Sequence, residues 1–120
     1  MINLKNFNIS EFDSPDVIGS GKLMDASFLL MLDKARDIAG VSFSITSGYR
    51  TDAHNSKVGG VSNSSHKIGK ASDIACSDSG KRSKIITALL AVGFTRIGVA
   101  SSFIHVDNDN TKSQDVIWTY

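Results

Sequence analysis

Two segments with helical spacing, each closed by a glycine, most constrain how this chain can fold. In residues 25–40, apolar side chains recur every three to four positions, Asp25 stands where an N-cap is expected, and Gly40 stands where a helix ends. Residues 77–93 repeat the pattern and end at Gly93. The sequence therefore predicts two main helices, with apolar stripes at Phe28, Met31, Leu32, Ala35, Ile38 and Ala39 in the first and Ile85, Ile86, Leu89 and Leu90 in the second.

Other segments alternate apolar and polar residues, which is the period of half-buried strands. The chain has 120 residues, 41% of them hydrophobic, and no internal repeat or linker, so it suits one compact core and not two. We expect a single α+β domain over residues 1–120, with the two helices packed on a small antiparallel-rich sheet. The predicted strands are residues 41–46, 70–76, 94–100 and 102–107, with 115–120 as a further candidate, and residues 51–65 are a predicted loop with one helical turn near 52–57.

The net charge and the short apolar runs argue against two classes of partner, nucleic acid and the membrane interior. Thirteen basic residues against 12 acidic ones give a net charge of +1, which provides no basic field for nucleic acid. No apolar run approaches the roughly 20 residues of a membrane span, so we expect no stable membrane insertion. The opening residues, "MINLKNFNIS", lack the apolar core of a signal peptide. The single cysteine, Cys76, forms no internal disulfide, and we expect it to be buried because it continues a predicted strand.

Four titratable side chains lie close to the predicted strands: His66, Asp73, His105 and Asp107. Asp73 shares its strand face with small alanines, which leave room for a loop carrying His66 to fold back over the strand. Imidazole nitrogen and carboxylate oxygen are first-choice ligands for zinc, and a catalytic zinc site uses three protein ligands. From the residues alone, two interpretations stay open: a metal site, or ordinary polar side chains satisfied by hydrogen bonds.

A wider pattern favours the metal. The stretches "SGYRT.AHN" at 47–55, "VGG" at 58–60, "S.H..G.A.D" at 64–73 and "RIG....FIHVD" at 96–107, with "ISEFDSPD" near the N-terminus, follow one another in order. Together they resemble the M15 family of zinc D-Ala-D-Ala carboxypeptidases and cell-wall endopeptidases, and most of all its short, single-domain bacteriophage members. The resemblance implies a hedgehog/DD-peptidase-like fold and one zinc ion per chain, held by His66, Asp73 and His105. The implied reaction is hydrolysis of a peptide bond in the peptidoglycan stem or cross-bridge.

The resemblance also suggests roles for further residues. The arginine of "SGYR", Arg50, is expected to face the site, where it would stabilise the oxyanion or grip the substrate. Ser64 would contact the substrate or hold the ligand loop. The general base does not carry over from the family: many relatives have an acid three positions before the last zinc histidine, where this chain has Ser102, and others have a second histidine two positions before it, where this chain has Phe103. Asp107 is the nearest acid, either as the catalytic base or as a partner that orients an imidazole. His54 is a further candidate base, although hydrogen bonding within its own loop is the more ordinary role.

A second class of function stays open. Hedgehog signalling domains share this zinc-site layout without acting as peptidases, so the chain could instead be a non-catalytic, zinc-containing peptidoglycan-binding module. As a bacteriophage-like peptidase it would be made in the host bacterial cytoplasm, act on the cell wall during lysis or entry, and reach the wall with the help of another protein. We expect a monomer. Neither the bond that is cut nor the route to the wall follows from the sequence.

Overall fold

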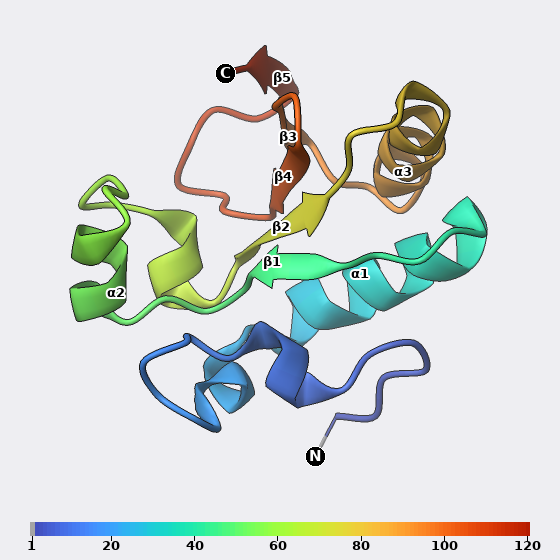
Figure 1. The fold of residues 1–120 in the computed structure, drawn as a ribbon. Helices are drawn as coiled ribbons and strands as arrows, with labels where there is room; N and C mark the ends of the chain where they lie inside the picture. The colour runs from blue at the N-terminus through green and yellow to red at the C-terminus, as the bar shows by residue number, and fades with distance from the viewer. Residues whose placement is uncertain (1) are drawn as a thin grey trace.

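The structure, a computed structural model, describes residues 2–120, which form three α-helices, three short 3-10 helices and five strands (Figure 1). The α-helices are α1 (Ala26–Ala39), α2 (Asp52–Lys57) and α3 (Ser79–Ala91), and the 3-10 helices are η1 (Ile9–Phe12), η2 (Ser20–Leu23) and η3 (Ser65–Ile68). The strands are β1 (Ile45–Ser47), β2 (Ala71–Ala75), β3 (Arg96–Val99), β4 (Phe103–Asp107) and β5 (Val116–Thr119).

All five strands belong to one sheet in the order β1-β2-β4-β3-β5. Every neighbouring pair is antiparallel except β3 and β5, which run parallel. The predicted α+β architecture with an antiparallel-rich sheet is therefore confirmed. Its central pair, β2 and β4, places Asp73 directly opposite His105.

The two main helices form where local signals predict them. Asp25 caps α1 by accepting a hydrogen bond of 2.9 Å from the Phe28 amide, and Gly40 ends the helix in the left-handed conformation at a φ of 67°. Asp78 caps α3 in the same way. The predicted helical turn near 52–57 is also confirmed, as α2.

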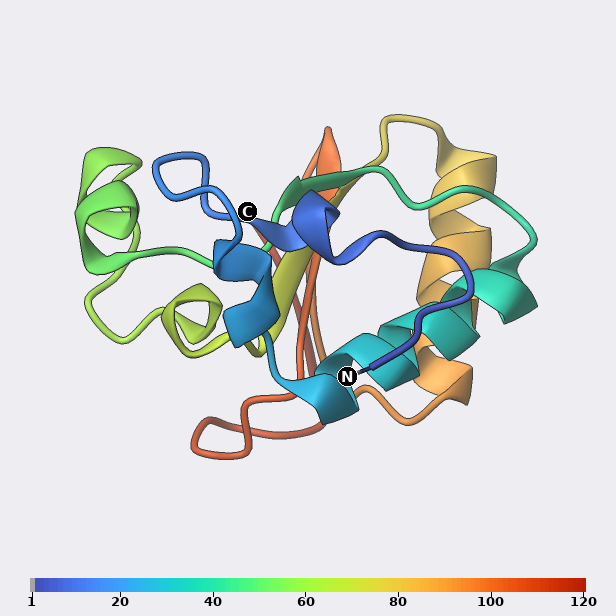
Figure 2. The same cartoon turned by 90° about the horizontal axis from the view of Figure 1, so that it is seen from below.

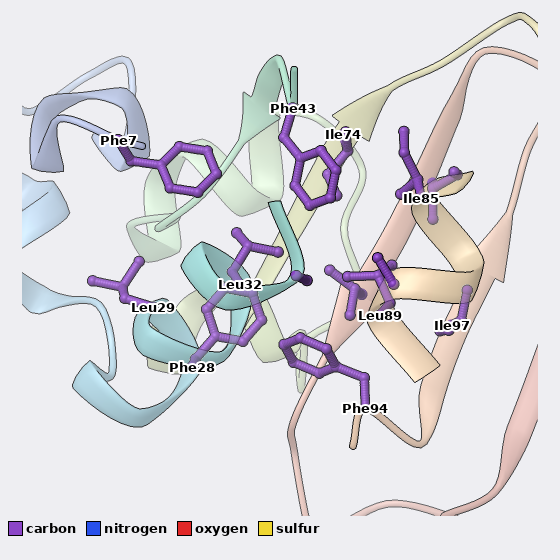
Figure 3. Close-up of a cluster of buried hydrophobic side chains, with 14 of the residues drawn as sticks. Phe7, Phe28, Leu29, Leu32, Phe43, Ile74, Ile85, Leu89, Phe94 and Ile97 are labelled. Carbon is purple, nitrogen blue, oxygen red and sulfur yellow. The ribbon is translucent and has the colours of Figure 1, made fainter. Parts of the chain in front are cut away.

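The hydrophobic core lies between the sheet and the helices α1 and α3. Both helices stand on one side of the sheet, and α2 with η3 lies on the other (Figure 2). Figure 3 shows side chains from α1, α3 and the strands meeting in this core, and Cys76 is buried beside them as expected. Because side chains alternate along a strand, the faces of β2 and β4 that turn away from the core are free to carry polar groups.

One strand prediction needs correction, and another is confirmed with a pairing that was not predicted. The first strand, predicted at 41–46, is only the three-residue β1 at Ile45–Ser47. The alternation in this segment reports burial rather than pairing, since Phe43 is in the core although it precedes the strand. The last candidate strand is real as β5, but its parallel pairing with β3 could not be read from a local pattern. Within residues 2–120, no helix is long and apolar enough to cross a membrane.

Candidate metal centre

The pairing of β2 with β4 brings a carboxylate and an imidazole together on the sheet face opposite the core. Asp73 and His105 are cross-strand partners, and His105 Nδ1 lies 2.9 Å from Asp73 Oδ1. Their neighbours in sequence, Ile74 and Ile104, point the other way and are fully buried in the core. The strand period thus separates the hydrophobic face from a polar one.

The loop before β2 folds back over this face, as the sequence analysis expected, and delivers His66 from η3. Ser64 caps η3, because its hydroxyl accepts a hydrogen bond of 3.3 Å from the His66 amide. The His66 ring is almost fully buried, and its Nε2 lies 3.3 Å from Asp73 Oδ1. A backbone hydrogen bond from the Arg50 amide to the His66 carbonyl ties the two loops together.

The three side chains match the donor set and spacing of a zinc site. Their ligand atoms all lie within 4.8 Å of one another. Tetrahedral zinc with bonds of about 2.0–2.1 Å needs ligand atoms roughly 3.3 Å apart, which is close to the two separations at Asp73 Oδ1. Two neutral imidazoles and one carboxylate are also ligands that zinc prefers. The residues therefore fit the metal that the sequence predicts, and their role as ligands stays a prediction.

Hydrogen bonds behind the ligands fix which ring nitrogen faces the centre. His66 Nδ1 lies 2.8 Å from the Gly48 carbonyl oxygen, which can only accept, so Nδ1 carries a proton and, in the neutral ring that a metal would bind, Nε2 keeps a free lone pair. His105 Nε2 lies 2.7 Å from Asp107 Oδ2, which leaves Nδ1 directed at Asp73. A carbonyl or carboxylate behind each imidazole is the usual support of a histidine that binds a metal.

The titratable groups of the site shift one another's pKa values. Burial alone would raise the pKa of the Asp73 carboxyl, but hydrogen bonds and charges from His105 and His66 outweigh it and hold that pKa far below its usual range. Burial would lower the pKa of the His105 imidazole, whereas hydrogen bonds to Asp107 and Asp73 raise it above its ordinary value. For Asp107, the burial that favours protonation is likewise overcome by His105, so its pKa is lowered. Both carboxylates are therefore ionised at neutral pH.

Asp107 is buried, and each of its two oxygens already has a partner. Its Oδ1 accepts a hydrogen bond of 2.7 Å from Arg96 Nε and one of 3.1 Å from the Asp109 amide, while Oδ2 contacts His105. The Arg96 guanidinium also lies over the Trp118 ring, 4.9 Å from its centroid. Both oxygens of Asp107 are therefore in contact with a hydrogen-bonding partner.

Arg50 reaches the centre from the segment after β1. Its guanidinium donates to Ser47 Oγ at 3.1 Å and to Asn55 Oδ1 at 3.3 Å, and its Nη2 lies 3.5 Å from Asp73 Oδ2. The side chain is mostly buried and is oriented by these contacts. Arg50 therefore lies beside Asp73, one of the three predicted ligands, and its role toward a substrate stays a prediction.

These groups line one cleft of about 450 Å³ that runs over the polar face of the sheet. Ser64 lies in its wall, together with apolar side chains from the loop after α2 and from the C-terminal part of the chain, namely Val58, Val61, Phe103, Trp118 and Tyr120. Within the described part of the chain, Asp73 and Asp107 are the carboxylates that line it. His54 is not in the cleft: it lines a separate hollow with Pro15 and Asp16.

Several residues of the site escaped the sequence analysis. Trp118 packs near the His105 ring at a centroid distance of 5.5 Å, and Asn55 holds Arg50. Gly98 makes room for the indole, because a Cβ there would lie 2.6 Å from Trp118 Nε1. The "AHN" motif contained Asn55, five residues after its partner Arg50, but its spacing alone does not reveal that contact. The "RIG" motif contained Gly98, whose partner Trp118 is 20 positions further along the chain, so no local signal could assign it a role.

Comparison with known proteins agrees with this geometry. A search of curated proteins returned no match. The sequence model of a family described as Peptidase M15 matches residues 5–107, which include every predicted metal ligand and Arg50. Since that match covers most of the chain, this protein is a member of the peptidase M15 family.

Proposed function

We propose that the chain is a zinc-dependent peptidase that hydrolyses a peptide bond in the peptidoglycan stem or cross-bridge. The observation that carries the proposal is the convergence of His66, Asp73 and His105 in a cleft large enough for a peptide segment. Membership of the peptidase M15 family supports peptidase chemistry. The proposal includes two activities, a D,D-carboxypeptidase and an endopeptidase. The fragments that the chain releases distinguish between them.

His66 Nε2, Asp73 Oδ1 and His105 Nδ1 would hold one zinc ion. When bound, zinc supplies Lewis acidity, which polarises a peptide carbonyl and makes water a better nucleophile near neutral pH. The protein holds the ligands in place: the Gly48 carbonyl and Asp107 keep the two rings in the tautomers that binding requires.

Arg50 would act on the substrate. Its guanidinium is fixed by Ser47 and Asn55, so it can donate a hydrogen bond in the cleft without first being ordered. A donor of this kind stabilises negative charge that develops on the carbonyl oxygen, typically by a factor of about 10²–10³ in rate. Ser64 would line the substrate path while it caps η3.

We assign Asp107 the orienting role rather than that of the base. A general base needs a lone pair within reach of the water proton, and the oxygens of Asp107 already accept from Arg96, His105 and the Asp109 amide. Its contact with His105 instead has the geometry of a carboxylate that fixes a metal-binding imidazole.

One observation favours a second candidate function, a zinc-containing module that binds peptidoglycan without cutting it. Both carboxylates that line the cleft within residues 2–120 have hydrogen-bond partners, and the position where the family resemblance leads us to expect an acid holds Ser102. The ordered Arg50 and the three converging ligand atoms favour the enzyme, because binding alone does not need an oriented arginine beside a metal.

We further propose that the chain acts as a monomer on the bacterial cell wall, in phage lysis or entry, after synthesis in the host cytoplasm. The ground is the resemblance, seen in the sequence motifs, to short bacteriophage members of the family. This proposal can fail while the peptidase proposal stands, because the role and the chemistry are separate.

The test is digestion of purified peptidoglycan by the zinc-loaded chain, by the chelator-treated chain, and by the chelated chain to which zinc is returned. Mass spectrometry of the soluble fragments names the bond from the fragment ends. Zinc-dependent release of fragments supports the peptidase. Zinc retention and sedimentation with the wall, without fragments from several wall chemistries, would replace it by the binding module.

A further inference from the structure

A buried carboxylate next to the metal centre has no part in the mechanism above. Asp109 lies in the loop after β4, two residues past the last residue of the family match, and is only 2% exposed. Its Oδ2 accepts a hydrogen bond of 2.7 Å from the Ser65 hydroxyl, and its Oδ1 accepts one of 2.6 Å from the Thr111 hydroxyl and one from the Thr111 amide. Lys112 Nζ lies 3.7 Å from Oδ2 and compensates the charge.

These contacts join the two segments that carry the histidines. Ser65 immediately precedes His66 in η3, so the side chain of Asp109 holds the segment of one predicted ligand. The backbone amide of Asp109 donates to Asp107 Oδ1, and Asp107 contacts His105, so the same residue also supports the other ligand. The two segments are 44 residues apart in sequence at this point.

Lys112 adds further contacts between the loop after β4 and the segment that carries His66. Its ammonium donates to Ser65 Oγ at 2.9 Å and to the Asn63 carbonyl at 2.8 Å, so the loop after β4 grips the ligand loop at two further points. The Ser65 hydroxyl thus donates to Asp109 and accepts from Lys112. A hydroxyl used in both directions fixes the position of its backbone more tightly than a single bond would.

We propose that Asp109 is a positioning residue that, through Ser65, clamps the His66 segment against β4 and so sets the spacing of the metal ligands. The inference rests on the proposed zinc site and extends it to residues outside the matched family region. Losing a group that hydrogen-bonds a metal-binding side chain typically changes metal affinity by a factor of about 10–100, and we expect a comparable effect for a contact that acts through the backbone of Ser65.

Two variants, each of which removes one hydroxyl that donates to the Asp109 carboxylate, give a matched test. Ser65→Ala removes the donor that connects Asp109 to the His66 segment, whereas Thr111→Val removes a donor of similar length within the loop of Asp109 itself. Each chain is titrated with zinc against a chromophoric chelator to obtain Kd, and with cobalt(II) to record the ligand-field absorption of the metal. Urea unfolding in excess chelator measures the stability of each metal-free fold.

We expect Ser65→Ala to weaken zinc binding by about 10–100-fold and to change the cobalt spectrum, while Thr111→Val keeps the wild-type Kd and spectrum. Without metal, both variants should lose a modest amount of stability, somewhat more in Ser65→Ala because its hydroxyl also accepts from Lys112. Asp109→Asn is a second variant, since it turns one acceptor toward Ser65 or Thr111 into a donor, and it too should weaken zinc binding.

Equal zinc affinities and spectra for wild type, Ser65→Ala and Asp109→Asn would overturn the inference while leaving the zinc site intact. Equal losses of zinc affinity in Ser65→Ala and Thr111→Val would also overturn it, because the effect would then be a general loosening of the loop. If the wild-type chain itself bound no zinc, the proposed function would fail, and the inference with it, which is a distinguishable result.

Discussion

Replacing Asp107 by asparagine should damage the protein in two separable ways. The substitution keeps the shape but removes a charge that is 2.7 Å from Arg96 Nε, in a pair whose side chains are 1% and 12% exposed. Unit charges about 4 Å apart interact by about 4 kcal/mol at an effective dielectric constant of 20. Breaking a buried pair by removing one partner costs about 3–5 kcal/mol, and we expect the low end because asparagine keeps one acceptor.

The second effect concerns the metal. Asparagine can present an amide nitrogen to His105 Nε2 or keep an oxygen there, but it no longer offers the ring a charged acceptor. Loss of a carboxylate behind a metal-binding imidazole lowers metal affinity by about 10–100-fold. Urea unfolding in chelator measures the first effect, and zinc titration against a competing chelator measures the second.

A double-mutant cycle with Arg96→Gln tells the two effects apart. If the lost stability comes from the stranded guanidinium, Asp107→Asn combined with Arg96→Gln should recover much of it, since no uncompensated charge remains. The zinc defect should persist in the double variant, because it arises at His105. Additive losses of stability, or recovery of zinc affinity in the double variant, would refute this account of the Arg96 and His105 contacts.

Three further outcomes are expected. Alanine at His66, Asp73 or His105 should abolish zinc retention, seen by elemental analysis after gel filtration, while circular dichroism stays native; retained zinc would remove that residue from the ligand set. Arg50→Ala should keep zinc and lower kcat on a wall-derived peptide by about 10²–10³-fold, and an unchanged kcat would exclude a role at the oxyanion. Gly48→Ala should lower stability and zinc affinity together, because its Cβ would lie 2.6 Å from the backbone of η1 and push away the carbonyl that orients His66; a wild-type zinc Kd in this variant would show that the carbonyl is dispensable.

Local signals account for the part of the fold that could be predicted. The helices α1 and α3 carry their own caps and apolar stripes, so their positions are written into short segments of sequence. The boundaries of β1 and the parallel pairing of β5 depend on strands far away in the chain, and no short segment encodes them. For the same reason, alternation correctly placed Phe43 in the core but misplaced it in a strand.

The candidate site also contains residues that the sequence predicted and residues that it did not. The predicted ligands came from a motif resemblance rather than from spacing, and the structure places them within reach of one another. The supporting groups could not be foreseen, because Gly48, Asp109 and Trp118 act through contacts with residues 18, 44 and 13 positions away. Expectations about partners and cellular location remain predictions.

The opposite faces of β2 and β4 have a consequence for how this chain can change in length. Ile74 and Ile104 fill the core while their neighbours Asp73 and His105 face the cleft, so one inserted or deleted residue in either strand would exchange the two sets. Ligands would enter the apolar interior and isoleucines would enter the site. Viable insertions and deletions should therefore fall in the loops on either side of these strands, where a change in length does not exchange the two faces.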